Sequence, residues 1–218
     1  MSQPSVAVRV AGMWLATASF LMVPVFVLHG PIAHDLTEQM HRIANAALRW
    51  TVVHWIAGAA LSLFALAGLV VVASGSRLTE SRSTMTAWAL LVVSSLWTIT
   101  TAVTEATVVT RAAVTGDVET FEAWWAFAEG MANGFSFFAL SVAVIAANEA
   151  RIAERALPAW SARVAMIAGV ASFGGWAVGM WFGISFGSML WAISSIVLSL
   201  WTLWFGFALM NSGVEGPA

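Results

Sequence analysis

Six long apolar runs dominate this sequence, and they restrict its fold more than any other feature. The runs cover about residues 10–28, 50–73, 86–109, 122–147, 159–182 and 189–210. Each is close to the roughly 20 residues that an α-helix needs to cross about 30 Å of hydrocarbon. Charged residues make up only 9% of the chain, so lipid is the solvent that most of it should meet. We therefore predict an all-α, polytopic membrane bundle of six transmembrane helices, with residues 1–218 forming a single domain.

The segment 31–49, between the first two runs, is too polar to span a membrane. Its apolar residues recur at steps of three and four: Ile32, Leu36, Met40, Ile43 and Ala47. The opposite face carries polar side chains at the same spacing: His34, Glu38, His41 and Asn45. This pattern is typical of an amphipathic helix. We predict that the segment lies along the membrane surface.

The arginines predict the orientation of the bundle, because short loops rich in basic residues stay on the cytoplasmic side. If the N-terminus is inside, six arginines fall on the cytoplasmic side: Arg9, Arg77, Arg82, Arg151, Arg155 and Arg163. The outer side then holds three: Arg42, Arg49 and Arg111. Both termini are thus expected in the cytoplasm. The general plan resembles small six-helix membrane proteins of bacteria, which implies the bacterial inner membrane.

Missing residue types exclude whole classes of function. All nine basic residues are arginine, so no lysine is present for a retinal Schiff base or for the phosphate loop of a nucleotide-binding protein. Without cysteine there is no disulfide, thiolate zinc site or iron–sulfur cluster. The net charge of −2 offers no basic patch, so we expect no nucleic-acid partner. The expected partner is the lipid bilayer.

Four ionisable side chains lie in the outer half of the predicted spans. His29 ends the first run, His54 lies one turn into the second, Glu105 lies one turn before the end of the third, and Glu129 lies two turns into the fourth. Imidazole and carboxylate are ligands that zinc, copper and non-haem iron accept when thiolates are absent. We predict that these four residues form a transition-metal site. The alternative is that they pair with one another, with nearby arginines or with water.

The polar segment between the first two runs adds further candidate ligands on the same side. His34, Glu38 and His41 are able to reach the site if this segment folds over it as a lid. Haem is a weaker alternative cofactor, with His29 and His54 as axial ligands on neighbouring helices. Five tryptophans lie near predicted span ends, where we interpret them as an aromatic belt at the interface: Trp50, Trp124, Trp125, Trp160 and Trp181.

Four glycines recur every four residues at the end of the fifth run: Gly175, Gly179, Gly183 and Gly187. Small residues at this spacing allow another helix to approach closely. We predict that the series packs helices together, with homo-oligomer formation as the alternative.

Three classes of function are consistent with the sequence. The leading hypothesis is a membrane-embedded binding protein or enzyme with an outward-facing histidine and carboxylate site that holds a metal. The second is an accessory subunit of a larger membrane complex, which the glycine series would suit. The third is a small-solute transporter, for which a polar face on the third run could line a path: Ser94, Thr98, Thr101 and Glu105.

Overall fold

The computed structural model describes residues 6–30, 32–33, 35–152 and 155–211. The described part of the chain is helical apart from short connections, and it contains no strand. It has six helical spans that are long and apolar enough to cross a membrane: Val6–His29, Ala47–Ser74, Arg82–Thr115, Val118–Glu149, Ala159–Trp181 and Ser185–Asn211. The six predicted spans are confirmed as helices. All but the fifth extend beyond their predicted bounds at both ends, because polar residues in the first and last turns continue the helix.

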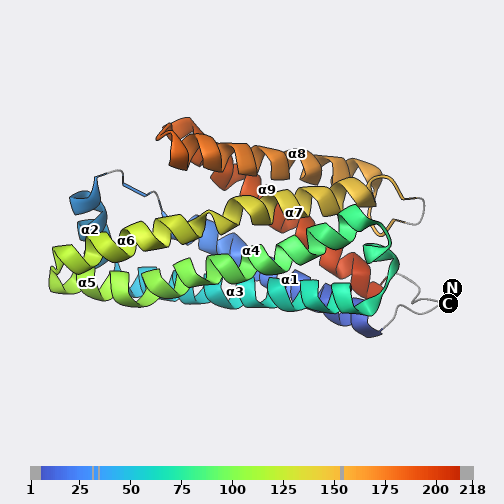
Figure 1. Ribbon diagram of the computed structural model, residues 1–218, viewed down its shortest axis with the longest axis horizontal. Coiled ribbons are helices and arrows are strands. Elements are labelled where there is room, and N and C mark those ends of the chain that lie inside the picture. Colours follow the sequence, from blue (N-terminus) through green and yellow to red (C-terminus); the bar gives the residue numbers. More distant parts are fainter. Residues whose placement is uncertain (1–5, 31, 34, 153–154, 212–218) are drawn as a thin grey trace.

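Several spans consist of more than one helical element (Figure 1). The first, second and sixth spans are single helices: α1 (Val6–His29), α3 (Ala47–Ser74) and α9 (Ser185–Asn211). The third comprises α4 (Arg82–Thr104), the π-helix η2 (Glu105–Val109) and α5 (Thr110–Thr115). The fourth comprises α6 (Val118–Ala132) and α7 (Gly134–Glu149), and the fifth α8 (Ala159–Trp176) and the π-helix η3 (Ala177–Trp181). Two short helices lie in connections: α2 (Leu36–Asn45) and the 3-10 turn η1 (Arg77–Thr79).

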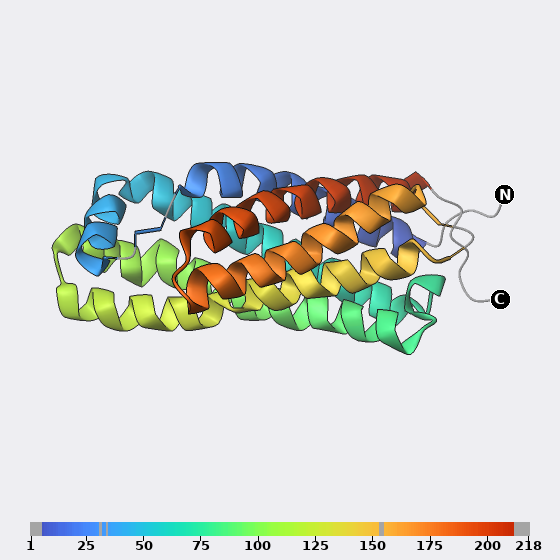
Figure 2. The same ribbon diagram turned by 90° about the horizontal axis from the view of Figure 1, so that it is seen from above.

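The spans pack in the order of the sequence and close into a ring. α1 packs on α3, α3 on α4, α4 on α7, α7 on α8 and α8 on α9, and α9 returns to α1. The ribbon views show the same antiparallel arrangement, with the start of α1 and the end of α9 at the same end of the bundle (Figures 1 and 2). A chain with an even number of antiparallel spans must begin and end at the same end of the bundle. The interior of the ring is filled mainly by alanine, leucine and aromatic side chains.

The spans differ in length, and this difference builds a cap at one end. The third and fourth spans have 34 and 32 residues, or about 50 Å, whereas the fifth has 23, or about 35 Å. The turn between α5 and α6 therefore extends beyond the turn between η3 and α9 (Figure 2). At the α5–α6 turn, Asp117 accepts a hydrogen bond from the Thr120 amide and begins α6. Hydrogen bonds from Thr120 hold the pKa of Asp117 below its usual value.

The helix α2 packs on this cap. It is shorter than predicted, because Asp35 caps its first turn through the Glu38 amide and residues 47–49 already belong to α3. Its apolar side lies in a small core with side chains of α3, η2, α5 and α6: Met40, Ile43, Trp50, Val109, Ala112, Ala113, Phe121 and Trp125. Protein therefore covers the apolar face that we had expected to lie on the membrane surface. The reason is that the extended third and fourth spans provide an apolar wall beside it.

Two of the five predicted belt tryptophans belong to the same cap core. Trp50 and Trp125 are only 4% and 3% exposed, so the belt interpretation is wrong for both. The remaining three are exposed, as a belt requires: Trp124, Trp160 and Trp181. Position near a span end did not distinguish the buried tryptophans from the exposed ones, because the cap buries only one side of the helices that carry them.

The glycine series lies between the fifth and sixth spans of the same chain. A Cβ atom at Gly187 would clash with the backbone of Gly179 and Val178, and one at Gly175 would lie 2.6 Å from the Trp191 amide nitrogen. Gly183 has φ +68° and forms the turn that joins the two spans. The close approach that these glycines permit is thus an intramolecular one between α8–η3 and α9.

Candidate metal centre

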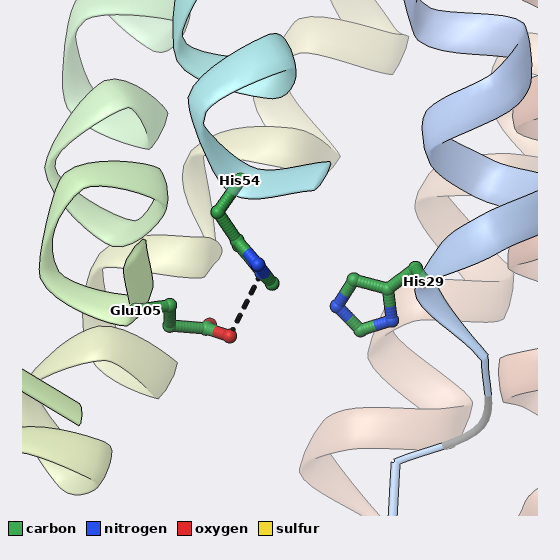
Figure 3. Close-up of side chains that lie close together, drawn as sticks. All are labelled: His29, His54 and Glu105. Carbon is green, nitrogen blue, oxygen red and sulfur yellow. Dashed lines mark ion pairs between the residues drawn. The ribbon is translucent and has the colours of Figure 1, made fainter. Parts of the chain in front are cut away.

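Three of the four predicted ligands converge at one point near the cap. His29 is the last residue of α1, His54 lies in the second turn of α3, and Glu105 is the first residue of η2. Their side chains point toward a common space from three different helices (Figure 3). One ligand atom from each lies within 4.8 Å of the other two, so the group could hold a metal ion. His54 and Glu105 are buried, and His29 is partly buried.

The hydrogen bonding of His54 leaves a lone pair directed at a carboxylate. Its Nδ1 lies 2.8 Å from the Trp50 carbonyl oxygen, which only accepts, so Nδ1 carries the proton of a neutral imidazole. Nε2 is then an acceptor, yet it lies 2.9 Å from Oε2 of Glu105. The two atoms form an ion pair when the imidazole carries a second proton, whereas the neutral imidazole presents a lone pair to the carboxylate. A cation shared by the two atoms would satisfy both.

His29 repeats this arrangement. Its Nδ1 lies 2.9 Å from the Gly30 carbonyl oxygen, and the other ring nitrogen faces His54 and Glu105 (Figure 3). A second imidazole nitrogen is thereby presented to the same space as an acceptor. An Nδ1–H bonded to a carbonyl while Nε2 faces the ion is the usual way in which proteins orient histidine ligands. Two imidazoles and one carboxylate form a donor set that zinc and non-haem iron accept.

Aromatic contacts hold the two histidine rings in place. The Trp50 ring lies 4.7 Å, centroid to centroid, from each imidazole, and the imidazoles lie 5.1 Å from each other, edge to face. Rings in such contact leave no room for a macrocycle between them. The geometry therefore argues against the haem alternative with His29 and His54 as paired axial ligands.

The π-helix η2 turns Glu105 toward the histidines. A π-helix accommodates an extra residue in its turn, which rotates the side chains that follow relative to those that precede, and such segments are frequent at functional sites. Within this turn, the Thr110 hydroxyl donates a hydrogen bond to the Glu105 carbonyl oxygen at 2.6 Å. Glu105 is buried as a result, although it lies in a helix that reaches the cap.

Two adjoining cavities open from the triad of His29, His54 and Glu105. The inner chamber, of about 110 Å³, is lined by the triad and by four aromatic side chains: Phe26, Phe135, Trp176 and Trp191. The vestibule, of about 470 Å³, lies beside it and is lined by residues of the cap, of the loop after α1 and of the turn before α9. His29, Phe26 and Trp191 line both cavities, so the vestibule adjoins the chamber at the triad.

The other predicted ligands lie apart from the triad. Glu129 is exposed and lines the vestibule. Glu38 is exposed and forms an ion pair with Arg42 one turn along α2. His41 is exposed on the same helix, and His34 lies outside the described residues. The group that could hold a metal thus comprises His29, His54 and Glu105.

Sequence reasoning missed the aromatic residues that complete the site. Trp50 contacts both histidines, and Asn133 accepts hydrogen bonds from the indole nitrogens of Trp176 at 3.0 Å and Trp181 at 2.8 Å. In a sequence with 13 tryptophans, no single one stands out. Helical spacing did contain one signal, since Trp50 precedes His54 by four residues and so shares its face.

Comparisons with protein-family models, with curated proteins and with solved structures give no match to this chain.

Proposed function

We propose that this chain is a membrane-embedded metalloprotein that binds one divalent transition-metal ion at His29, His54 and Glu105. The observation that carries the proposal is the convergence of three possible ligand atoms, two imidazole nitrogens and a carboxylate oxygen, within 4.8 Å of one another. Such a group is costly to bury unless a cation lies within it. The 2.9 Å contact between His54 and Glu105 is an ion pair when the imidazole is protonated, and a bound metal ion would displace that proton.

Helix lengths support a position of the triad at the outer boundary of the membrane. From Arg9 to His29, and from Glu149 back to exposed Glu129, the chain advances 20 positions, which is about 30 Å of helix. That distance equals the thickness of the hydrocarbon layer. With the arginine-rich end in the cytoplasm, the triad and vestibule lie level with the outer leaflet, and the cap projects beyond it.

The charge distribution favours a cation at this end. Seven acidic residues lie on the triad side of the bundle: Asp35, Glu38, Glu105, Asp117, Glu119, Glu122 and Glu129. Only three arginines accompany them, whereas the opposite end carries six arginines and, among the described residues, two acidic ones, Glu80 and Glu149. A surface of one sign attracts ions of the other and raises their local concentration. The acidic outer end would therefore draw a metal ion toward the vestibule, where Glu129 lies.

Three protein ligands leave at least one coordination position free, as catalytic metal sites require. A metal held in this way supplies a Lewis acid and lowers the pKa of a bound water. The protein contributes the orientation of the two imidazoles through the Trp50 and Gly30 carbonyls, and the largely apolar chamber that faces the free position. We therefore favour a metal-dependent enzyme or sensor over a purely structural site.

Little in the structure favours the transporter hypothesis. The hydroxyls of Ser94 and Thr98, which would have to line the polar path of a transporter, donate to carbonyls of their own helix at 2.7 Å. Toward the cytoplasmic side of the chamber, the two voids found in the described core have volumes of about 20 and 10 Å³, which is about one water each. The accessory-subunit hypothesis stays a prediction.

Metal analysis of gently purified protein tests the proposal. We expect about one equivalent of zinc, iron or another divalent metal per chain, retained after gel filtration. His54→Ala and Glu105→Gln should each abolish retention, because loss of a ligand exceeds the 10–100-fold cost typical of outer-shell changes. His41→Ala is the matched control and should keep the metal, because His41 is exposed on α2. A folded parent protein that takes up no added zinc, iron(II) or cobalt(II) would overturn the proposal.

A further inference from the structure

The inner chamber has the size and walls of a binding site for one aromatic ring. Its volume of about 110 Å³ is of the same order as the roughly 150 Å³ engineered cavity that admits benzene. Four aromatic side chains form one side, and they meet mostly edge to face: Phe26, Phe135, Trp176 and Trp191. Aromatic rings prefer edge-to-face and offset contacts with one another. This wall therefore favours a flat ring over a branched aliphatic group.

The polar side chains of the lining favour one polar atom on that ring. Thr101, which also lines the chamber, donates its hydroxyl to the Ala128 carbonyl oxygen at 3.1 Å and is thus already satisfied. The remaining polar side chains of the lining are His29, His54 and Glu105. A ligand that fills the chamber accordingly meets both aromatic surface and the metal position. An oxygen attached directly to the ring would reach the metal while the ring stays in the chamber.

The vestibule provides a route from the membrane. It adjoins the chamber at His29, and its walls include Met180, Met189 and Trp125. The turn that borders it is strongly apolar and exposed, with Phe182 72%, Ile184 52% and Phe186 60% accessible. Because the fifth span has only 23 residues, this turn would lie at the outer boundary of the hydrocarbon layer when the span crosses it. A molecule dissolved in the outer leaflet would meet this opening.

We propose that the chamber binds the ring of a membrane-dissolved phenol or hydroquinone, with its ring oxygen at the metal and any apolar tail in the vestibule. The inference rests on the proposed function for the metal contact. It adds the class of ligand: an aromatic ring that carries an oxygen and partitions into lipid. The volume of the vestibule, about 470 Å³, accommodates a tail without any change in the chamber.

Fluorine NMR with 4-fluorophenol tests this assignment on the full chain in lipid nanodiscs. The probe is ring-sized and bears one oxygen, and fluorobenzene is the matched probe without it. We expect saturable binding of 4-fluorophenol, at least about tenfold tighter than that of fluorobenzene. Cobalt(II) in the metal site should broaden the bound 4-fluorophenol resonance, whereas diamagnetic zinc(II) should not. Equal affinity for both probes, or no broadening by bound cobalt(II), would overturn the proposal.

Two alanines of one helix provide matched variants. Ala132 lines the chamber, so Ala132→Phe should fill it and abolish saturable binding while the metal is retained. Ala126 is exposed on the same helix α6, so Ala126→Phe should change neither. If Ala132→Phe does not fold, Ala57→Leu tests the same chamber from α3. Binding that survives in the filled variants would refute the chamber as the site.

The two proposals fail in different ways. If the parent protein binds no metal, the proposed function fails, and the metal contact of the ring fails with it. If metal binds with the expected stoichiometry but 4-fluorophenol binds no more tightly than fluorobenzene, the metal site stands and the ligand class is wrong.

Discussion

The adjacent glycines Gly174 and Gly175 provide a sharp test of how the fifth and sixth spans pack. An added Cβ at Gly174 meets no atom within 4 Å. At Gly175 the same atom would lie 2.6 Å from the Trp191 amide nitrogen and 2.9 Å from the Gly187 carbonyl oxygen. Both contacts are with backbone of another helix, which no side-chain rotation relieves. The two variants therefore make the same glycine-to-alanine change at neighbouring positions of α8. They differ only in whether the added methyl group meets the backbone of α9.

The expected effects have opposite signs. Alanine in place of glycine within a helix stabilises by about 0.5–1 kcal/mol, and Gly174→Ala should show this gain. In Gly175→Ala, the contact must open from 2.6 Å to an ordinary 3.4 Å, so α8 and α9 must separate by about 0.8 Å. Overpacking of a close-packed interior typically costs about 1–3 kcal/mol, which exceeds the helical gain. We expect a net loss of about 1–2 kcal/mol for Gly175→Ala.

Unfolding in mixed micelles, followed by circular dichroism, measures both variants against the parent. The expected order of stability is Gly174→Ala, parent, Gly175→Ala. Oligomer size in gel filtration should stay the same, because Gly175 faces α9 of its own chain. Equal stability of the two variants would refute the close approach of α8 and α9. A change in oligomer size without a change in stability would instead assign the glycines to contacts between chains.

Two further predictions concern the indole hydrogen bonds and the orientation. Asn133→Leu removes the acceptor of the Trp176 and Trp181 indole N–H groups. The variant should be less stable by about 1–3 kcal/mol in the same unfolding assay. An unchanged transition would show that these hydrogen bonds contribute nothing to stability. A periplasmic reporter inserted at Gly116 should be active and one at Gly75 silent, since both glycines lie in turns at opposite ends of the bundle; the reverse pattern would place the triad on the cytoplasmic side.

Hydrophobic length could be predicted from the sequence because it is a local property. A run of about 20 apolar residues satisfies its backbone only as a helix in lipid, whatever the rest of the chain does. The six helical spans follow from such local patterns. The same reasoning placed His54 and Glu105 at a common depth, since depth is a count of residues along each helix.

The direction in which a side chain points from its helix, and the distance between two helices, are not local properties of the sequence. Glu105 and Glu129 lie at similar depth, yet η2 turns Glu105 into the interior while Glu129 lines the vestibule. Segment 31–49 has the pattern of a surface helix, yet α2 packs on α5 and α6 because those helices extend beyond their neighbours.

The sequence by itself determined that this chain is a six-span helical protein and that its histidines and several carboxylates gather toward one end. Only the tertiary structure decided that His29 joins His54 and Glu105, that Trp50 holds both imidazoles, and that an aromatic chamber adjoins them. The physical reason is that residue counts measure position along a helix axis, whereas a metal site depends on contacts of a few ångströms across it. Those contacts are set by how six helices close into a ring.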